Sequence, residues 1–142
     1  MIKPGVIRPL AVCIIKDEGR LLVTVSRDSF KKENYCRLLG GGIEFGETGE
    51  EALRREFKEE LGTDLENVKY LTSMENIFTY EGKPGHEIDL LFEADLTNKE
   101  LYKKDNIQIL DNNEGGAATW QKISDFKDKK LILYPSVSLQ YL

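Results

Sequence analysis

Carboxylates are the side chains of this sequence whose type and spacing best suggest chemistry. Glu56, Glu59 and Glu60 fall within one short acidic stretch, and at about 100° per residue a helix would place them on one arc. Three such groups repel one another unless a cation neutralises them, and hard oxygen ligands favour Mg²⁺, Mn²⁺ or Ca²⁺ over zinc. One interpretation is therefore a divalent-metal site. The other is a solvated helix face whose charges pair with Arg55 and its neighbours.

The element expected to position these carboxylates is a helix with local start and stop signals. Thr48 and Glu51 form a T-x-x-E capping box, and Gly62 supplies a C-terminal stop. Apolar residues recur at helical spacing between them, at Ala52, Leu53, Phe57 and Leu61. The sequence therefore predicts an amphipathic helix whose acidic arc adjoins its buried face.

The spacing of the glycines and charged residues carries a family resemblance. From Gly41, five residues lead to Glu47 and seven more to Arg55, after which the sequence reads EFKEELGT. This resembles the Nudix box, G-x5-E-x7-R-E-U-x-E-E-x-G-U, in which U is a bulky aliphatic residue. Every fixed glycine, glutamate and arginine matches, Phe57 stands at a U position, and only Thr63 departs, at the last hydrophobic position. The resemblance to the Nudix superfamily favours the metal interpretation.

The resemblance implies an activity and a set of site residues. Nudix enzymes hydrolyse a nucleoside diphosphate linked to a further group X with the help of a divalent metal, here Mg²⁺, for which Mn²⁺ should substitute. The implied metal ligands are Glu56, Glu59, Glu60, the Gly41 carbonyl and, directly or in support, Glu47. Arg55 would orient the glutamates, because it can reach Glu51 and Glu59 one helical turn away on either side.

Two glutamates are candidates for the general base. In some family members the base belongs to the box, which points to Glu56. In others it lies on a loop shortly before a tryptophan-bearing strand. Glu114 occupies that place, since two glycines follow it and Trp120 comes six residues later. An exposed loop acid is the other interpretation of Glu114.

Cues to the substrate are sparse. Tyr80 lies 17 residues beyond Thr63, a spacing that resembles the tyrosine of dinucleoside polyphosphate hydrolases. His86 opens a predicted strand beside Glu87 and is expected to be structural or solvated. Phe78, Tyr80 and Trp120 are expected to be core or edge aromatics. Specificity should come from the loops at 27–36, 78–86 and 103–116, so nucleoside triphosphates, nucleotide sugars and dinucleoside polyphosphates all remain open.

Length and composition set the outer bounds. A chain of 142 residues suits one domain, 1–142. The net charge of −5 argues against a nucleic-acid partner, and no apolar run is long enough for a membrane. Cys13 should be a core thiol and Cys36 semi-exposed, without metal-ligand spacing. We expect a cytoplasmic protein that binds a small phosphorylated substrate, and a homodimer is left open.

Strands outnumber helices in the predicted order of elements. An apolar strand at 9–15 and a strand at 20–26 are expected to form a hairpin, followed by a polar loop at 27–36. Extended segments follow the helix at 68–71, 74–80 and 86–96, with a short strand at 118–121 and a short helix at 135–141. This order fits an α/β fold with a mixed sheet between helices, as in the α/β/α sandwich that the resemblance implies.

Two other function classes compete with the metal-dependent pyrophosphohydrolase. A catalytically silent Nudix-fold domain would bind or sense a ligand, and it would be expected to have lost glutamates of the box. An isomerase of the same fold needs a catalytic cysteine, and Cys36 lacks an evident setting for that role. A metal-dependent phosphate-release assay separates the hydrolase from both.

Overall fold

The computed structural model describes residues 4–110 and 116–142, and its strands form two mixed sheets. In the first sheet, β1 (Ile7–Ile14) pairs in parallel with β7 (Lys83–Leu96) and antiparallel with β5 (Leu39–Gly42). The long strand β6 (Leu65–Tyr80) completes this sheet antiparallel to β7. The resulting strand order is β5-β1-β7-β6.

The second sheet is built around β3 (Arg20–Asp28), which pairs antiparallel with β4 (Glu33–Arg37) and β9 (Ala117–Lys122). Three short strands extend it: β2 (Lys16–Asp17), β8 (Asn106–Gln108) and β10 (Leu133–Tyr134). The parallel pairing of β10 with β4 makes this sheet mixed as well. A 3₁₀ helix, η1 (Lys99–Lys103), precedes β8.

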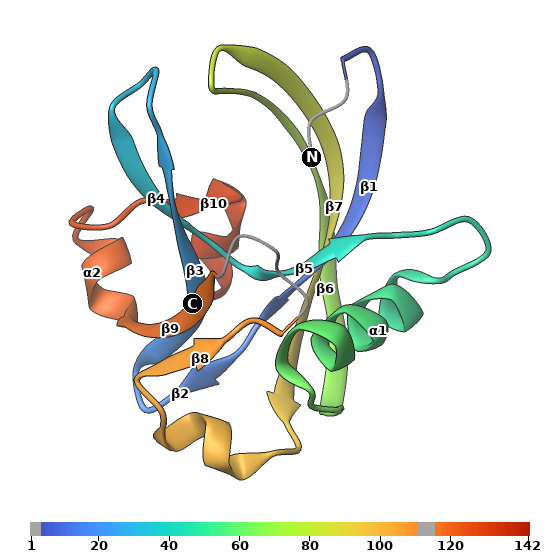
Figure 1. Ribbon diagram of the computed structural model, residues 1–142, viewed down its shortest axis with the longest axis vertical. Helices are drawn as coiled ribbons and strands as arrows, with labels where there is room; N and C mark the ends of the chain where they lie inside the picture. The colour runs from blue at the N-terminus through green and yellow to red at the C-terminus, as the bar shows by residue number, and fades with distance from the viewer. Residues whose placement is uncertain (1–3, 111–115) are drawn as a thin grey trace.

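Helices cover the sheets at separate places (Figure 1). The long helix α1 (Gly49–Leu61) packs against β5 and β1, whereas α2 (Ile123–Lys127) and the terminal 3₁₀ helix η2 (Ser136–Tyr141) lie beside the second sheet. The predicted α/β class with mixed β-structure and helices is therefore confirmed, with two sheets in place of one. No helix in the described ranges is both long and apolar enough to cross a membrane.

Both faces of β1 are buried, as its continuous apolar run predicts. Ala11 and Cys13 join a core cluster with the apolar face of α1, whereas Val12 and Ile14 join a second cluster on the other side of the strand. Cys13 is fully buried, so the prediction of a core thiol is confirmed, and burial raises the pKa of this thiol well above its usual range. Cys36 was predicted to be semi-exposed, which is wrong, because β4 is flanked by β3 and β10 and buries it.

Two predictions are wrong, one about the pairing of strands and one about the extent of a loop. The segments at 9–15 and 20–26 do not form a simple hairpin, because β1 belongs to the first sheet and only the short β2 pairs with β3. The predicted polar loop at 27–36 is largely strand, since β3 runs to Asp28 and β4 begins at Glu33. Asp28, Lys31, Glu33 and Tyr35 of this segment line a cleft between the sheets. The sequence of the segment alone does not reveal that cleft.

Candidate active site

Helix α1 begins and ends where its sequence signals predict. The Thr48 hydroxyl accepts a hydrogen bond from the Glu51 backbone N–H (3.1 Å), and the Glu51 carboxylate accepts one from the Thr48 N–H (2.9 Å). Gly62 ends the helix in the left-handed region at φ 65°. The Glu51 carboxylate is therefore held at the N-terminus of the helix and, contrary to the prediction, is not a partner of Arg55.

Arg55 is the centre of the acidic cluster. Its Nε and Nη2 donate to the two carboxylate oxygens of Glu47 at 2.8 and 3.0 Å, and Nη1 donates to Glu56 at 2.9 Å and Glu59 at 3.4 Å. Nη2 also donates to the Gly42 carbonyl at 3.0 Å. The hydrogen bonds from Arg55 lower the pKa of Glu47 to about 2, and these carboxylates in turn raise the pKa of Arg55. The guanidinium thus fixes three predicted site glutamates and the backbone of β5.

Gly41 brings the backbone of β5 against the Glu56 carboxylate. A Cβ atom placed on Gly41 would lie 2.4 Å from Cδ of Glu56 and 2.6 and 2.7 Å from its oxygens. The preceding residue, Gly40, has φ +148°, and a Cβ there would lie 2.0 Å from the Ala11 carbonyl oxygen. The glycines therefore allow β5 to lie close against β1 and leave room for a carboxylate beside it.

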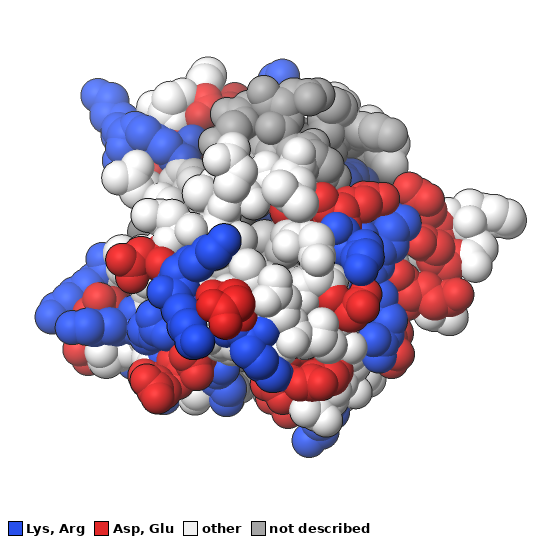
Figure 2. Space-filling model, turned by 60° about the horizontal axis from the view of Figure 1, so that its bottom comes forward, with Lys and Arg blue, Asp and Glu red and all other residues white. Residues whose placement is uncertain are grey.

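The donor set suits a hard divalent cation in kind. Carboxylates and a backbone carbonyl are oxygen ligands of the sort that Mg²⁺ and Ca²⁺ take, and the Gly41 backbone lies directly beside the Glu56 carboxylate. In residues 4–110 and 116–142, however, no three acidic, His or Cys side chains are arranged as a ready metal-binding group. In this arrangement Glu56 and Glu59 are instead paired with Arg55, at 2.9 and 3.4 Å. Figure 2 shows acidic atoms gathered over α1 and the loop before it.

Glu60 connects the cluster to the far end of the chain. Its backbone carbonyl accepts a hydrogen bond from the Leu110 N–H at 2.8 Å, and the Ile109 N–H donates to the Gly116 carbonyl at 3.1 Å. The predicted base Glu114 lies outside the described residues. The described residues on either side of it are therefore attached close to the C-terminal end of α1.

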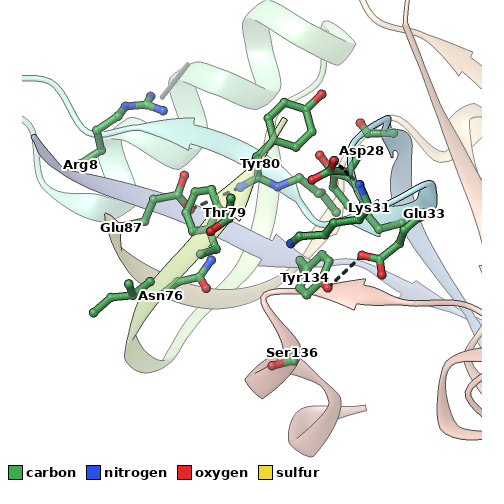
Figure 3. A pocket seen from close by; sticks show the side chains of 15 residues that line it. Arg8, Asp28, Lys31, Glu33, Asn76, Thr79, Tyr80, Glu87, Tyr134 and Ser136 are labelled. Carbon is green, nitrogen blue, oxygen red and sulfur yellow. Dashed lines mark hydrogen bonds and ion pairs between the residues drawn. The ribbon is translucent and has the colours of Figure 1, made fainter. Parts of the chain in front are cut away.

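A cleft of about 540 Å³ opens between the two sheets, and Figure 3 shows the side chains that line it. They come from β1, β3, β4, β6, β7 and β10, from the β3–β4 turn and from the first residue of η2. Three tyrosine rings meet edge to face there: the centroid of Tyr35 lies 6.1 Å from that of Tyr80 and 5.4 Å from that of Tyr134. Tyr80 and Phe78 were predicted to be core or edge aromatics, but they line this cleft. Trp120 is a buried core residue that donates to the Leu101 carbonyl.

The hairpins β3–β4 and β6–β7 meet at their tips and limit one side of the cleft. The Asp28 carboxylate accepts hydrogen bonds from the backbone of Phe30 (2.9 Å), Lys31 (3.1 Å) and Glu81 (3.2 Å). Burial acts to raise the pKa of Asp28, but these hydrogen bonds outweigh it and lower the pKa overall. The Glu81 carboxylate accepts from both the backbone and the hydroxyl of Ser29. These hydrogen bonds of Asp28 and Glu81 join two hairpins that lie far apart in the sequence.

Arg8 connects the cleft with the acidic cluster. It lines the cleft, and Figure 3 shows it at one end of the group, with Glu33 at the other. Its Nη2 would lie 3.4 Å from a Cβ placed on Gly42, the residue whose carbonyl accepts from Arg55. Sequence reasoning missed Arg8, because its relation to the box depends on the pairing of β1 with β5.

Two carboxyl groups lie near each other on β7, Glu87 in the lining of the cleft and Asp89 buried two residues further along the strand. Glu87 is 3% exposed and receives a long ion pair of 3.5 Å from Arg37. Asp89 is fully buried, and neither of its oxygens has a hydrogen-bond donor among the described residues. Burial first, and then the adjacent Glu87 carboxylate, raises the pKa of Asp89 to about 7. His86 points to the opposite face of β7 and does not line the cleft.

Comparisons with known proteins agree with this architecture. The family model described as NUDIX domain matches residues 7–139. The chain is 26% identical over 141 residues to the NAD-capped RNA hydrolase NudC of Mycobacterium tuberculosis, covering 94% of this chain and 42% of that protein. It is 47% identical over 60 residues to the nucleoside triphosphatase NudI of Enterobacter sp. strain 638, covering 42% of this chain and 43% of the relative. The chain thus spans less than half the length of these curated relatives.

Solved structures show the same fold. A MutT NUDIX hydrolase from Burkholderia pseudomallei superposes with a TM-score of 0.63 at 22% identity, covering 84% of this chain and 86% of that one. A NUDIX hydrolase from Nitrosomonas europaea gives a TM-score of 0.63 at 15% identity, covering 94% and 84%. Both likenesses extend over most of the chain, well beyond the 41–63 stretch.

Proposed function

The chain belongs to the NUDIX family, and on that premise we propose that it hydrolyses a diphosphate linkage in a nucleoside diphosphate-X substrate with the help of a divalent cation. The observation that carries the proposal is the arrangement around Arg55, which gathers Glu47, Glu56 and Glu59 beside the backbone of Gly41 and Gly42. Mg²⁺ is the proposed cation, with Mn²⁺ as a substitute. The names of two relatives refer to NAD-capped RNA and to nucleoside triphosphates. Both of these compounds contain a nucleoside diphosphate group.

Each residue of the cluster has a proposed role. Glu56, Glu59, Glu60 and the Gly41 carbonyl would hold the cation, which when bound withdraws charge from the diphosphate and makes water a better nucleophile. Glu47 keeps its bidentate pair with Arg55 and thereby helps to hold the guanidinium that orients Glu56 and Glu59. Arg55 orients Glu56 and Glu59 and offsets their repulsion until a cation binds. It is a positioning residue.

The general base has two proposed candidates. Glu114 is favoured by its position in the sequence, and its described neighbours Leu110 and Gly116 are attached near Glu60. Glu56 is the rival, because its carboxylate already lies beside the Gly41 backbone. A base must come within about 3 Å of the attacking water or act through one further water. Each candidate predicts a different effect on metal binding.

The substrate would extend from the cleft to the acidic cluster. The cleft is large enough for a nucleoside-sized group, since small-molecule sites commonly measure about 300–1,000 Å³. Its end at Arg8 adjoins Gly42 and therefore the acidic cluster. We expect the nucleoside in the cleft and the diphosphate beyond Arg8, against α1.

The test is a chromatographic assay of the phosphorylated hydrolysis products over a panel of nucleoside di- and triphosphates, nucleotide sugars, dinucleoside polyphosphates and NAD. The expected result is hydrolysis of at least one class with Mg²⁺ or Mn²⁺ and none with excess EDTA. Full turnover in EDTA would refute the metal assignment. Binding of panel members without any hydrolysis in either metal would instead identify a silent ligand-binding domain.

A further inference from the structure

We propose that the cleft recognises a nucleobase that carries an exocyclic amino group, and that Glu87, positioned by Asp89, accepts the hydrogen bond from that group. The inference rests on the proposed function for the nucleotide nature of the substrate. It adds which part of the nucleotide the cleft reads and which residue reads it.

The shape of the cleft suits a flat aromatic ligand. Its walls carry the rings of Tyr35, Phe78, Tyr80 and Tyr134, and its volume is about 540 Å³. The tyrosines are fixed against one another edge to face, so their positions do not depend on a ligand. Preformed aromatic walls favour stacking with a planar ring and do not distinguish one base from another. Selectivity must therefore come from the polar groups of the lining.

The charges of the lining balance, which favours an uncharged ligand group. The cations are Arg8, Lys31 and Arg37, and the matching acids are Asp28, Glu33 and Glu87. Two of these acids are already engaged: Asp28 by three backbone N–H groups, and Glu33 by the Tyr134 hydroxyl at 3.1 Å. Glu87 is the remaining acid: it accepts a long hydrogen bond of 3.5 Å from Arg37 and lies beside Asp89. A carboxylate has room for about four hydrogen bonds, so Glu87 has accepting capacity to offer a ligand.

Asp89 explains why Glu87 stays an acceptor. The two carboxyl groups follow each other on the same face of β7, and Asp89 is fully buried without a donor among residues 4–110 and 116–142. Two adjacent buried carboxylates repel, so the pair is most stable with one proton. Burial places that proton on Asp89, which can then donate to Glu87. In this arrangement Asp89 is the donor of the pair and Glu87, which lines the cleft, is the acceptor.

A row of residues across the first sheet sets the pattern that a ligand meets. Asn76 on β6 and Arg8 on β1 are the register partners of Glu87, and all three line the cleft. An amino group placed at Glu87 would donate a hydrogen bond to a carboxylate that is almost fully shielded from solvent. A keto oxygen at the same position would face that carboxylate lone pair to lone pair. A site of this kind rejects the analogue that lacks its hydrogen-bond donor.

The test compares nucleotides that differ in one amino group: GTP with ITP, ATP with purine riboside triphosphate, and CTP with the keto analogue UTP. One readout is kcat/KM with Mg²⁺, and the other is calorimetric binding of the corresponding nucleoside monophosphates without metal. Wild type should favour the amino member of at least one pair by about 10- to 100-fold in both readouts, the effect of one hydrogen bond to a charged group. Equal treatment of every pair, or a preference for the keto member, would overturn the proposal.

Variants then assign the preference to its residues. In Glu87→Gln the preference should fall below about 3-fold, mainly through KM, whereas Glu75→Gln, an exposed acid on β6, should leave it unchanged. Asp89→Asn should retain it, because an amide can donate to Glu87 as the protonated acid does. If the preference for the amino-bearing nucleotide persists in Glu87→Gln, Glu87 is not the acceptor. If the preference is lost in Asp89→Asn, Asp89 does not position Glu87 in the proposed way.

The two readouts separate this inference from the proposed function. Base preference in binding without hydrolysis would refute the hydrolase and support the inference. Hydrolysis without base preference would support the hydrolase and refute the inference. The wild-type comparison needs no variant, so the proposal can fail even if Glu87→Gln does not fold.

Discussion

The acidic cluster and the cleft meet at Arg8, yet the chain builds them in opposite ways. The described part of the cluster comes from one stretch, from Gly41 to Glu60, with α1 as its support. The cleft takes side chains from six strands, a turn and the terminal 3₁₀ helix, from Arg8 near the start of the chain to Ser136 near its end. Under the proposed function, the residues that act on the diphosphate are thus kept together in a short motif. Residues that read the attached group are spread over the sheets, where each can change separately.

The largest predicted effect concerns a residue that would extend the cluster beyond this stretch. If Glu114 is the general base, Glu114→Gln should lower kcat by about 10²- to 10⁴-fold while metal affinity and KM remain near wild type. Glu56→Gln should instead weaken metal binding together with the rate. Steady-state kinetics and Mn²⁺ titrations of both variants decide between them. A Glu114→Gln enzyme that keeps more than about half of wild-type kcat would leave Glu56 as the base.

The next prediction tests whether the chemistry depends on the helix carboxylates. Glu59→Gln and Glu60→Gln should each lower kcat by about 10²-fold or more, because each removes a charged ligand from the reacting centre. Glu50→Gln is the matched control on the same helix, because Glu50 pairs with Arg54 at 3.1 Å and is not a predicted site residue. Near-native kcat in Glu59→Gln or Glu60→Gln would mean that the cluster is a charged surface.

A smaller effect is expected from the close approach of Gly41 to Glu56. Gly41→Ala should reduce kcat/KM by about 10-fold or more with little change in Tm, because the new methyl group displaces the end of a flexible side chain. Gly42→Ala is the control, since its Cβ would meet Nη2 of Arg8 at an ordinary 3.4 Å. Equal activity of the two variants would show that Glu56 can turn away without loss. Circular dichroism melting curves establish that both variants fold.

The smallest effect concerns the cleft and is a pH dependence of stability. The pKa of Asp89 rises from 3.8 to about 7 on folding, so the folded protein keeps a proton that the unfolded chain releases. This contribution to stability is complete below about pH 4 and is lost as the pH rises through about 7. Between pH 5 and 8, wild-type Tm should therefore fall more steeply than that of Asp89→Asn. Parallel curves for wild type, Asp89→Asn and the exposed control Asp105→Asn would contradict the assigned proton.

The sequence predicted the helix and most of the cluster because their contacts are local. The capping box of Thr48 and Glu51 and the buried face of Leu53 and Phe57 follow from helical geometry over a few residues. The link of Arg55 to Glu47 spans eight residues and crosses the loop, and it was not anticipated as a hydrogen bond. Even there, the spacing of the motif placed the right residue types together.

The cleft could not be predicted in this way because its contacts depend on strand pairing. Arg8 and Glu87 are adjacent only because β1 and β7 pair in parallel across 79 positions of sequence. The segment at 27–36 looks like a loop because it lacks the apolar alternation of an ordinary strand. Four of its residues line the cleft instead: Asp28, Lys31, Glu33 and Tyr35. Asp89 gave no sequence signal either, since an acid within an apolar strand is informative only once its neighbours are known.

The most direct test of the account is the hydrolysis rate as a function of Mg²⁺ concentration in wild type, Glu59→Gln and Glu87→Gln. We predict no turnover in excess EDTA for any of them. The half-saturating Mg²⁺ concentration should rise by about 10-fold or more in Glu59→Gln, because a carboxylate ligand is lost, and should stay at the wild-type value in Glu87→Gln. Turnover in EDTA, or the same half-saturating concentration in Glu59→Gln as in wild type, would contradict the assignment of metal binding to α1.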